Sequence, residues 1–198
     1  MGIKLVILDR DGTINADRDD YVKSADDFEP LPGALEAIAQ LNHAGFHVAV
    51  ATNQSGLGRG LFDMAALNAM HAKMNKLLAA VGGRVDAVFF CPHSPDEACT
   101  CRKPAPGLYE QIAERFGVAL TGVPVVGDSL RDLQAAVSVG AQPHLVLTGK
   151  AAALRGQALP ASYPAQTRVH EDLAAFVAHI LHLAPDGGPE GGVIQGRP

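Results

Sequence analysis

The sequence is short of cysteine, of long apolar runs and of positive charge. Its three cysteines are an odd number, and a chain so poor in thiols suits a reducing compartment, where a structural disulfide is not expected. The opening stretch MGIKLVILDRDG is apolar only briefly, so it resembles neither a secretory signal nor a membrane span. A net charge of −5 argues against a general nucleic-acid or anionic-membrane surface. We therefore expect a cytoplasmic protein that binds neither nucleic acid nor membrane.

Short apolar runs alternate with longer amphipathic segments along the chain. The runs predict strands at residues 4–9, 47–53, 86–91, 123–128 and 144–149, and the longer segments predict helices at 33–44, 63–81, 106–116, 130–139 and 171–183. Strands that are apolar almost throughout are typical of a parallel sheet buried on both faces. The pattern predicts an α/β fold with a Rossmann-like, doubly wound parallel sheet, whose active site lies beyond the carboxyl ends of the strands.

A chain of 198 residues suits one domain. We predict that this domain spans residues 1–184 and that the Gly/Pro-rich stretch 185–198 is a disordered tail. The polar excursion at residues 15–30 is too short for a separate domain, so no large cap domain is expected.

Polar or metal-binding residues stand at the ends of the predicted strands: Asp9, Thr52 with Asn53, Cys91, Asp128 and Thr148. In the stretch DRDGT, two carboxylates lie two residues apart. An aspartate such as Asp9 can attack a phosphoryl group to form an aspartyl-phosphate, and a second carboxyl, Asp11, can protonate the leaving oxygen and then deprotonate water. Gly12 allows a tight turn there. The alternative for this stretch alone is a solvated acidic turn.

Three further stretches fit phosphate chemistry, and each has a simpler alternative. Thr52 and Asn53 in TNQSG could bind phosphoryl oxygens, or they could belong to an ordinary turn. Lys103 could neutralise phosphoryl charge, or it could be a surface lysine. Asp128 and Asp132 in GDSLRD suit a hard cation such as Mg²⁺. Their alternative is an N-cap aspartate with a solvated neighbour.

All three cysteines lie in one stretch, CPHSPDEACTCRKP. It offers three thiols and an imidazole, a ligand set typical of structural tetrahedral zinc: Cys91, His93, Cys99 and Cys101. With four protein ligands no position is left for water, so we expect a structural ion. The alternative is a buried strand cysteine with incidental neighbours. Because the stretch runs straight into Arg102 and Lys103, we hypothesise that zinc rigidifies these two cations over the phosphate site.

Taken together and in this order, the stretches DRDGT, TN, K and GDSLRD resemble the haloacid dehalogenase-like phosphatases over about residues 4–149. The resemblance implies Asp9 as nucleophile, Asp11 as general acid/base, and Thr52 and Lys103 as phosphate binders. It also implies Mg²⁺ held by Asp9, Asp128 and the backbone carbonyl of Asp11, with Asp132 supporting the metal site.

With the zinc loop and TNQSGLGRG included, the chain is similar to a family of zinc-loop phosphatases without a cap. That family contains heptose-bisphosphate and histidinol-phosphate phosphatases, and the resemblance is closer to the former. It implies removal of the C7 phosphate of D-glycero-D-manno-heptose 1,7-bisphosphate in ADP-heptose and lipopolysaccharide core synthesis. The residues expected to bind this sugar phosphate are Asn53, Gln54, Ser55, Arg59, Arg102 and Lys103. We expect a monomer.

Other functions stay open on the sequence. Histidinol phosphate carries a cationic amine, and Asp17, Asp19 and Asp20 could favour it. A DNA 3′-phosphatase would share the first motif and the Thr-Asn turn, but the acidic balance counts against it. A zinc-stabilised phosphate- or nucleic-acid-binding module would keep the cysteine loop without needing both Asp9 and Asp11.

Overall fold

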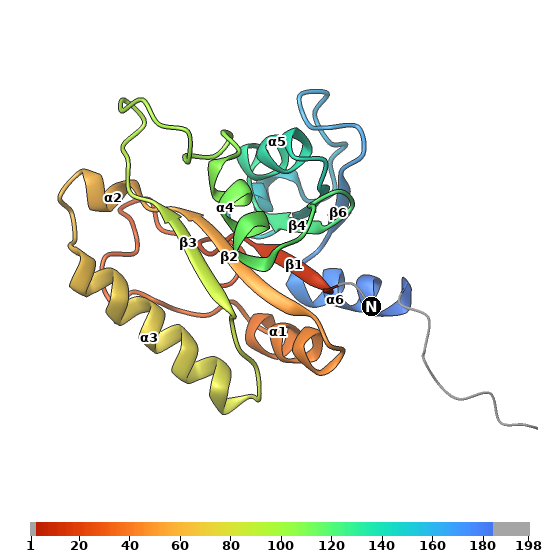
Figure 1. Cartoon of the computed structure of the whole chain (residues 1–198), viewed down its shortest axis with the longest axis horizontal. Coiled ribbons are helices and arrows are strands. Elements are labelled where there is room, and N and C mark those ends of the chain that lie inside the picture. Colours follow the sequence, from red (N-terminus) through yellow and green to blue (C-terminus); the bar gives the residue numbers. More distant parts are fainter. Residues whose placement is uncertain (1–2, 184–198) are drawn as a thin grey trace, which may run out of the picture.

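Six parallel strands form the centre of the fold in the computed structural model, which describes residues 3–183. Their order across the sheet is β3-β2-β1-β4-β5-β6 (Figure 1). The strands are β1 (Leu5–Leu8), β2 (His47–Asn53), β3 (Ala87–Cys91), β4 (Pro124–Gly127), β5 (Gln142–Val146) and β6 (Arg168–His170). Successive strands extend the sheet from β1 to β3, after which the chain returns to place β4 on the other side of β1. The order therefore reverses between β1 and β4, which is where ligands bind in open α/β sheets.

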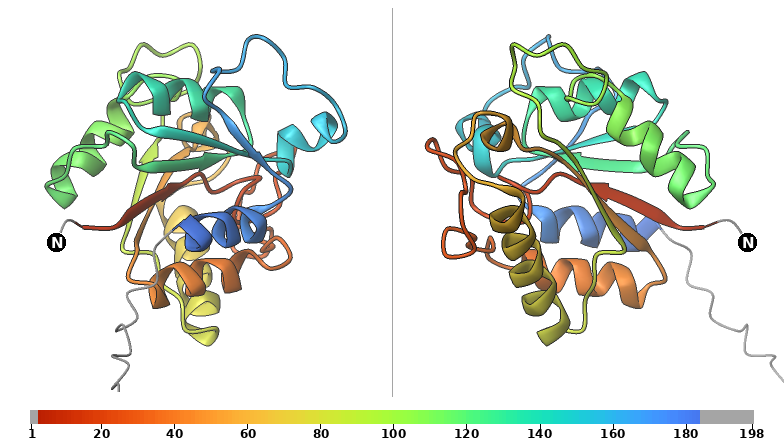
Figure 2. Two further views of the ribbon diagram at one scale, coloured as in Figure 1. Left: turned by 90° about the vertical axis from the view of Figure 1, so that its right-hand side faces the viewer. Right: turned by 60° about the vertical axis from the view of Figure 1, so that its left-hand side comes forward.

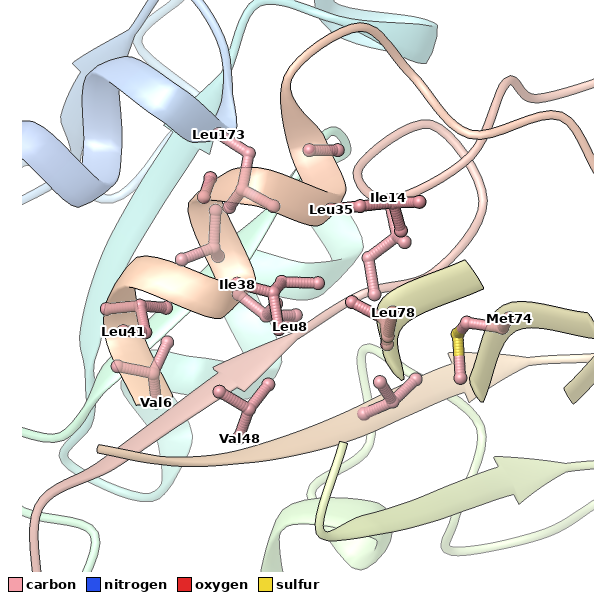
Figure 3. Packing of buried hydrophobic residues seen from close by; sticks show 14 of the residues in the cluster. Val6, Leu8, Ile14, Leu35, Ile38, Leu41, Val48, Met74, Leu78 and Leu173 are labelled. Atoms are coloured by element: carbon pink, nitrogen blue, oxygen red, sulfur yellow. The ribbon is translucent and has the colours of Figure 1, made fainter. Parts of the chain in front are cut away.

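Helices cover both faces of this sheet (Figure 2). On one face lie α1 (Ala34–His43), α3 (Met64–Ala80) and α6 (Leu173–Leu183), and on the other lie α4 (Gly107–Phe116) and α5 (Leu130–Ser138). The side chains of β1 point alternately to the two faces of the sheet, so they pack into an apolar cluster on each face. Val6 and Leu8 join the first apolar cluster (Figure 3), whereas Leu5 and Ile7 join the second. Burial on both faces explains why the sequence of β1 is apolar at every position.

The predicted α/β fold is confirmed, and the five predicted strands and five predicted helices correspond to β1–β5 and to α1, α3, α4, α5 and α6. The sequence missed three short elements: β6, the four-residue helix α2 (Ser55–Gly58) and the 3₁₀ helix η1 (Gly149–Leu154). Strand β6 lacks an apolar run because two of its three residues are exposed. Residues 15–30 form a loop between β1 and α1.

The predicted tail at 185–198 lies outside the described residues, and the domain boundary at 184 stays a prediction. Within residues 3–183, no helix is both long enough and apolar enough to cross a membrane.

Candidate active site

Three carboxylates meet where the strand order reverses. Asp9 follows β1 directly, Asp128 follows the neighbouring β4, and Asp132 lies in the first turn of α5. Each offers an oxygen within 4.8 Å of the others. The backbone N–H of Asp9 donates to the carbonyl of Val126 at 2.8 Å, which ties the end of β1 to β4. The local sequence pairs Asp128 with Asp132, and the sheet topology brings Asp9 to them.

Burial and mutual repulsion make this cluster electrostatically unfavourable when it is fully ionised. Burial, followed by the charge of Asp132, raises the pKa of Asp9 to about 7, although Lys103 works in the opposite sense. Burial, followed by the charges of Asp9 and Asp132, raises the pKa of Asp128 to about 8. A hard divalent cation with oxygen ligands would relieve both effects, so the donor set fits Mg²⁺.

Two glycines leave room for the Asp128 carboxylate. Gly12 has φ +82°, and a Cβ there would overlap the Asp128 side chain; the same holds at Gly149. The Thr148 hydroxyl donates to the Gly12 carbonyl at 2.6 Å, and the Lys150 N–H donates to Asp128 Oδ2 at 2.7 Å. The turn after Asp9 and the segment after β5 therefore clamp Asp128 between them.

Lys103 is a buried cation next to these carboxylates, with 2% of its side chain exposed. Its three N–H bonds match three acceptors: Asp9 Oδ1 at 2.9 Å, Asp132 Oδ1 at 2.6 Å and the Ala51 carbonyl at 2.6 Å. Burial opposes its charge, but Asp132 and Asp9 outweigh it and raise the pKa of Lys103. The ammonium therefore stays charged beside the carboxylate of Asp9, and the surface-lysine alternative is wrong.

Asp132 is not the solvated neighbour that the simpler alternative supposed. Its Oδ1 contacts Lys103, while its Oδ2 accepts from the backbone N–H and the hydroxyl of Ser129 at 3.0 and 2.6 Å. The bond from the Ser129 N–H belongs to the capping box of α5, in which the Ser129 side chain also accepts from the Asp132 N–H. Asp132 thus links the start of α5 to the buried lysine.

The turn after β2 contributes the next group of polar side chains. Thr52 is buried and its hydroxyl accepts from Gln54 Nε2 at 2.8 Å. The Asn53 amide donates to the Lys103 carbonyl at 3.1 Å and accepts from the Lys103 N–H at 3.0 Å. Asn53, expected to bind substrate, therefore braces the backbone of Lys103 in this structure.

The four predicted zinc ligands come together at the end of β3. Their ligand atoms all lie within 4.8 Å of one another. The sulfurs of Cys91 and Cys99 are 3.8 Å apart, and His93 Nδ1 lies 3.4 Å from Cys91 Sγ and 3.3 Å from Cys101 Sγ. Tetrahedral zinc with its usual bond lengths would separate two sulfurs by about 3.8 Å. The spacing and the chemistry of the donors both fit Zn²⁺.

A cleft of about 360 Å³ opens above the carboxylates. Its walls include Asn53, Gln54, Ser55 and Arg102, as expected from the sequence, but not Arg59, which is exposed outside it. The structure thus gives no contact that supports Arg59 as a substrate binder. Three cations that the sequence analysis did not single out also line the cleft: Arg18, Arg131 and Lys150.

Comparisons with known proteins agree with this geometry. A family model described as HAD-hydrolase-like matches residues 100–176, and one described as polynucleotide kinase 3 phosphatase matches residues 4–129. A D-glycero-beta-D-manno-heptose-1,7-bisphosphate 7-phosphatase from Bordetella bronchiseptica is 56% identical over 182 residues, 92% of this chain and 100% of that protein. The chain belongs to this phosphatase family.

Further relatives support the assignment. The Pseudomonas aeruginosa member is 51% identical over 181 residues, 91% of this chain and 99% of that protein. A crystal structure of D,D-heptose 1,7-bisphosphate phosphatase from B. bronchiseptica, complexed with magnesium and phosphate, matches with a TM-score of 0.87 at 56% identity, over 91% of this chain and 99% of that one. The corresponding structure from Burkholderia thailandensis matches with a TM-score of 0.69 at 52% identity, over 90% and 98% of the two chains.

In this member of the heptose-bisphosphate phosphatase family, the sequence analysis missed Arg10 and Asn15 beside Asp11, and it named Gln54 only as a substrate binder. The Asp11 carboxylate accepts from Arg10, from Asn15 Nδ2 at 2.9 Å and from Gln54 Nε2 at 2.8 Å. Burial would raise the pKa of Asp11, but Arg10 and these hydrogen bonds outweigh it and lower the pKa. The one available signal was Arg10 itself, a charged residue placed between two aspartates at the end of an apolar strand.

Proposed function

We propose that this protein is a Mg²⁺-dependent phosphatase that removes the C7 phosphate of D-glycero-beta-D-manno-heptose 1,7-bisphosphate and leaves heptose 1-phosphate. The observation that carries the proposal is the meeting of Asp9, Asp128 and Lys103 at the switch point of the sheet, in a chain 56% identical to a phosphatase of that name. The reaction would belong to ADP-heptose and lipopolysaccharide core synthesis.

Two steps account for the reaction. Burial would raise the pKa of Asp11, but Arg10 lowers it in the free protein, and a phosphate dianion bound beside the carboxyl raises it again, so that Asp11 can carry a proton when substrate is present. A carboxylate oxygen of Asp9 attacks the C7 phosphorus, the bond from phosphorus to the sugar O7 breaks, and Asp11 gives its proton to O7. Asp11 then takes a proton from a water molecule as that water attacks the aspartyl-phosphate, which frees phosphate and restores both carboxyls. Because one residue serves as acid and then as base, its protonation resets with each turnover.

The surrounding groups would stabilise the phosphoryl charge during both steps. The Lys103 ammonium lies 2.9 Å from Asp9, and the buried Thr52 hydroxyl stands at the end of the adjacent strand. Mg²⁺, held by Asp9, Asp128 and the backbone carbonyl of Asp11, would neutralise phosphoryl oxygens as a Lewis acid. Zn²⁺, held by the three cysteines and His93, would order the loop that carries Arg102.

The charges around the cleft support a bisphosphate rather than histidinol phosphate. Arg102 and Arg131 both line the cleft, and burial together with the charge of Arg131 lowers the pKa of Arg102. A second phosphate dianion would satisfy both guanidinium groups.

The acidic residues that could have favoured a cationic substrate are largely neutralised. Asp17 pairs with Lys150 at 2.8 Å, and Asp20 pairs with Arg18 and with Lys23, each at 3.0 Å. Among the described residues, Asp19 is the one of these three carboxylates without an ion pair, so a cationic amine would meet one unpaired carboxylate at this rim.

The test compares kcat/KM on heptose 1,7-bisphosphate and on histidinol phosphate, each with Mg²⁺ and with a chelator. We expect Mg²⁺-dependent phosphate release with a clear preference for the bisphosphate, and loss of activity in Asp9→Asn. A preference for histidinol phosphate would overturn the substrate assignment. Unchanged turnover by Asp9→Asn would overturn the mechanism.

A cytoplasmic location and a monomeric state are further parts of this proposal. Free thiols close enough to bind zinc suit a reducing compartment. Light scattering after size-exclusion chromatography of the full chain measures the oligomeric state directly, and a mass of twice the monomer would reject the second part.

A further inference from the structure

Arg10 stands between Asp9 and Asp11 in the sequence, and its side chain has no solvent exposure. The guanidinium reaches back to its neighbour, where Nε donates to Asp11 Oδ1 at 3.0 Å and Nη2 donates to Oδ1 and Oδ2 at 2.8 and 3.1 Å. A buried guanidinium needs a charged partner. Among the described residues, the carboxylate within ion-pairing distance of Arg10 is that of Asp11.

The far end of the guanidinium is held by a residue from a different element. His71 lies on α3, and its Nε2 is 3.1 Å from Arg10 Nη1. Arginine can only donate, so this ring nitrogen must be the acceptor and the imidazole must be neutral. In agreement, burial and then the charge of Arg10 lower the pKa of His71 to about 4.

The same network reaches the phosphate-binding turn. Arg10 Nη2 donates to Gln54 Oε1 at 3.3 Å, while Gln54 Nε2 donates to Asp11 Oδ2 and to the Thr52 hydroxyl, each at 2.8 Å. Both oxygens of Asp11 are therefore held by donors that are themselves anchored. The side chains of Arg10 and Gln54 therefore fix the position of the Asp11 carboxyl relative to Thr52.

We propose that Arg10 and His71 are positioning residues for Asp11, with His71 orienting the Arg10 guanidinium and Arg10 orienting the carboxyl that gives a proton to the leaving oxygen and then takes one from the attacking water. The inference rests on the proposed function only in taking Asp11 as the general acid/base. It adds two residues that act through Asp11 rather than on the substrate. Proton transfer by a positioned carboxyl contributes roughly 10²–10⁴-fold to rate, and this is the contribution that mispositioning would reduce.

The experiment measures kcat/KM on p-nitrophenyl phosphate and on phenyl phosphate. This parameter reports the transfer of the phosphoryl group to Asp9, and phenolate leaves less readily than p-nitrophenolate without a proton. Arg10→Lys keeps the positive charge but removes the planar guanidinium that donates to both oxygens of Asp11. His71→Phe removes the acceptor for Arg10, and His71→Gln restores one.

We expect Arg10→Lys and His71→Phe to lower the rate on phenyl phosphate about 10-fold more than the rate on p-nitrophenyl phosphate. His71→Gln should recover most of the wild-type ratio, and Lys76→Gln, an exposed change on the same helix, should not alter it. Equal losses on both substrates, or no loss in either variant, would overturn the inference. If Arg10→Lys does not fold, judged by thermal unfolding and zinc content, the His71 pair decides the question alone.

Failure of the proposed function would look different. If wild-type protein does not hydrolyse heptose 1,7-bisphosphate, the substrate assignment fails while the aryl phosphate ratio still tests Arg10 and His71. If Asp11→Asn leaves that ratio unchanged, Asp11 is not the proton donor, and the inference fails with the mechanism.

Discussion

Replacement of Asp132 tests how the fold keeps a lysine buried beside its nucleophile. The pair with Lys103 is 2.6 Å long, and both side chains are 2% exposed. Removing one partner of a buried pair costs about 3–5 kcal/mol because the remaining charge loses its compensation. Lys103 keeps Asp9 and the Ala51 carbonyl as acceptors. We therefore expect Asp132→Ala to lower the free energy of unfolding by about 3 kcal/mol, at the lower end of that range.

Part of this loss belongs to the helix cap rather than to the lysine. Asp132 Oδ2 accepts from the Ser129 hydroxyl at 2.6 Å, and Ser129→Ala removes that contact while leaving the pair with Lys103 in place. A lost cap costs about 1 kcal/mol. Ser129→Ala is thus the matched control, and the difference between the two variants measures the lost partner of Lys103 together with the bond from the Ser129 N–H to Asp132 Oδ2.

The loss should also depend on magnesium. Without it, the charge of Asp132 adds to the burial that raises the pKa values of Asp9 and Asp128, so its removal brings some relief. With Mg²⁺ bound, the cation already offsets this repulsion. Urea unfolding followed by circular dichroism should therefore show a larger loss for Asp132→Ala in Mg²⁺ than in chelator. A loss in Mg²⁺ no greater than that of Ser129→Ala would refute the role given to the pair.

Three further changes have expected outcomes. Gly12→Ala should lose Mg²⁺-dependent activity and stability because its Cβ would overlap Asp128. The control is Gly45→Ala, which has nearly the same φ but open space around it and should lose only the backbone cost of about 1–2 kcal/mol. Urea unfolding and turnover of both variants check this. Burial, then neighbouring positive charges, lowers the pKa of His144 to about 3, below the usual value of about 6.5. The neutral side chain of His144 therefore contributes fully to the free energy of unfolding above pH 6.5, and this contribution falls towards pH 3 by up to about 1.4 kcal/mol per pH unit. His144→Leu should make the free energy of unfolding depend less on pH over this range. An unchanged pH dependence would contradict the prediction. Cys99→Ser should lose zinc by elemental analysis and about 10-fold in kcat/KM on the bisphosphate, with a smaller loss on p-nitrophenyl phosphate.

The framework of this fold could be read from the sequence because buried strands are apolar on both faces. Strand β1 illustrates this, since Val6 and Leu8 pack on one helix layer and Leu5 and Ile7 on the other. Strand β6 could not be found in this way, because Val169 at its centre is 45% exposed. An edge strand of three residues carries too little burial to leave a pattern.

In the site as well, residues within short motifs could be predicted from the sequence, whereas contacts between distant segments could not. Asp9, Asp128 and the zinc ligands lie within short motifs next to strand ends, and one parallel sheet brings all strand ends to the same edge. The contact of Arg10 with His71 joins residues 61 positions apart and depends on where α3 packs. Asn53 illustrates the converse. Its type and place suit substrate binding, yet both polar atoms of its amide bond the Lys103 backbone.

These contacts change the role expected for the zinc loop. Lys103 is held through its backbone by Asn53 and through its ammonium by three acceptors, none of which is a zinc ligand. Arg102 differs. Among the described residues its side chain has one hydrogen bond, at 3.3 Å, to the backbone carbonyl of the ligand His93. Loss of zinc should therefore release Arg102 before Lys103, because only the former depends on the loop for its position. If Arg102 binds the retained phosphate, a zinc-free protein loses selectivity for the bisphosphate before it loses phosphoryl transfer. Equal losses of activity on the bisphosphate and on p-nitrophenyl phosphate would instead show that the loop supports Lys103.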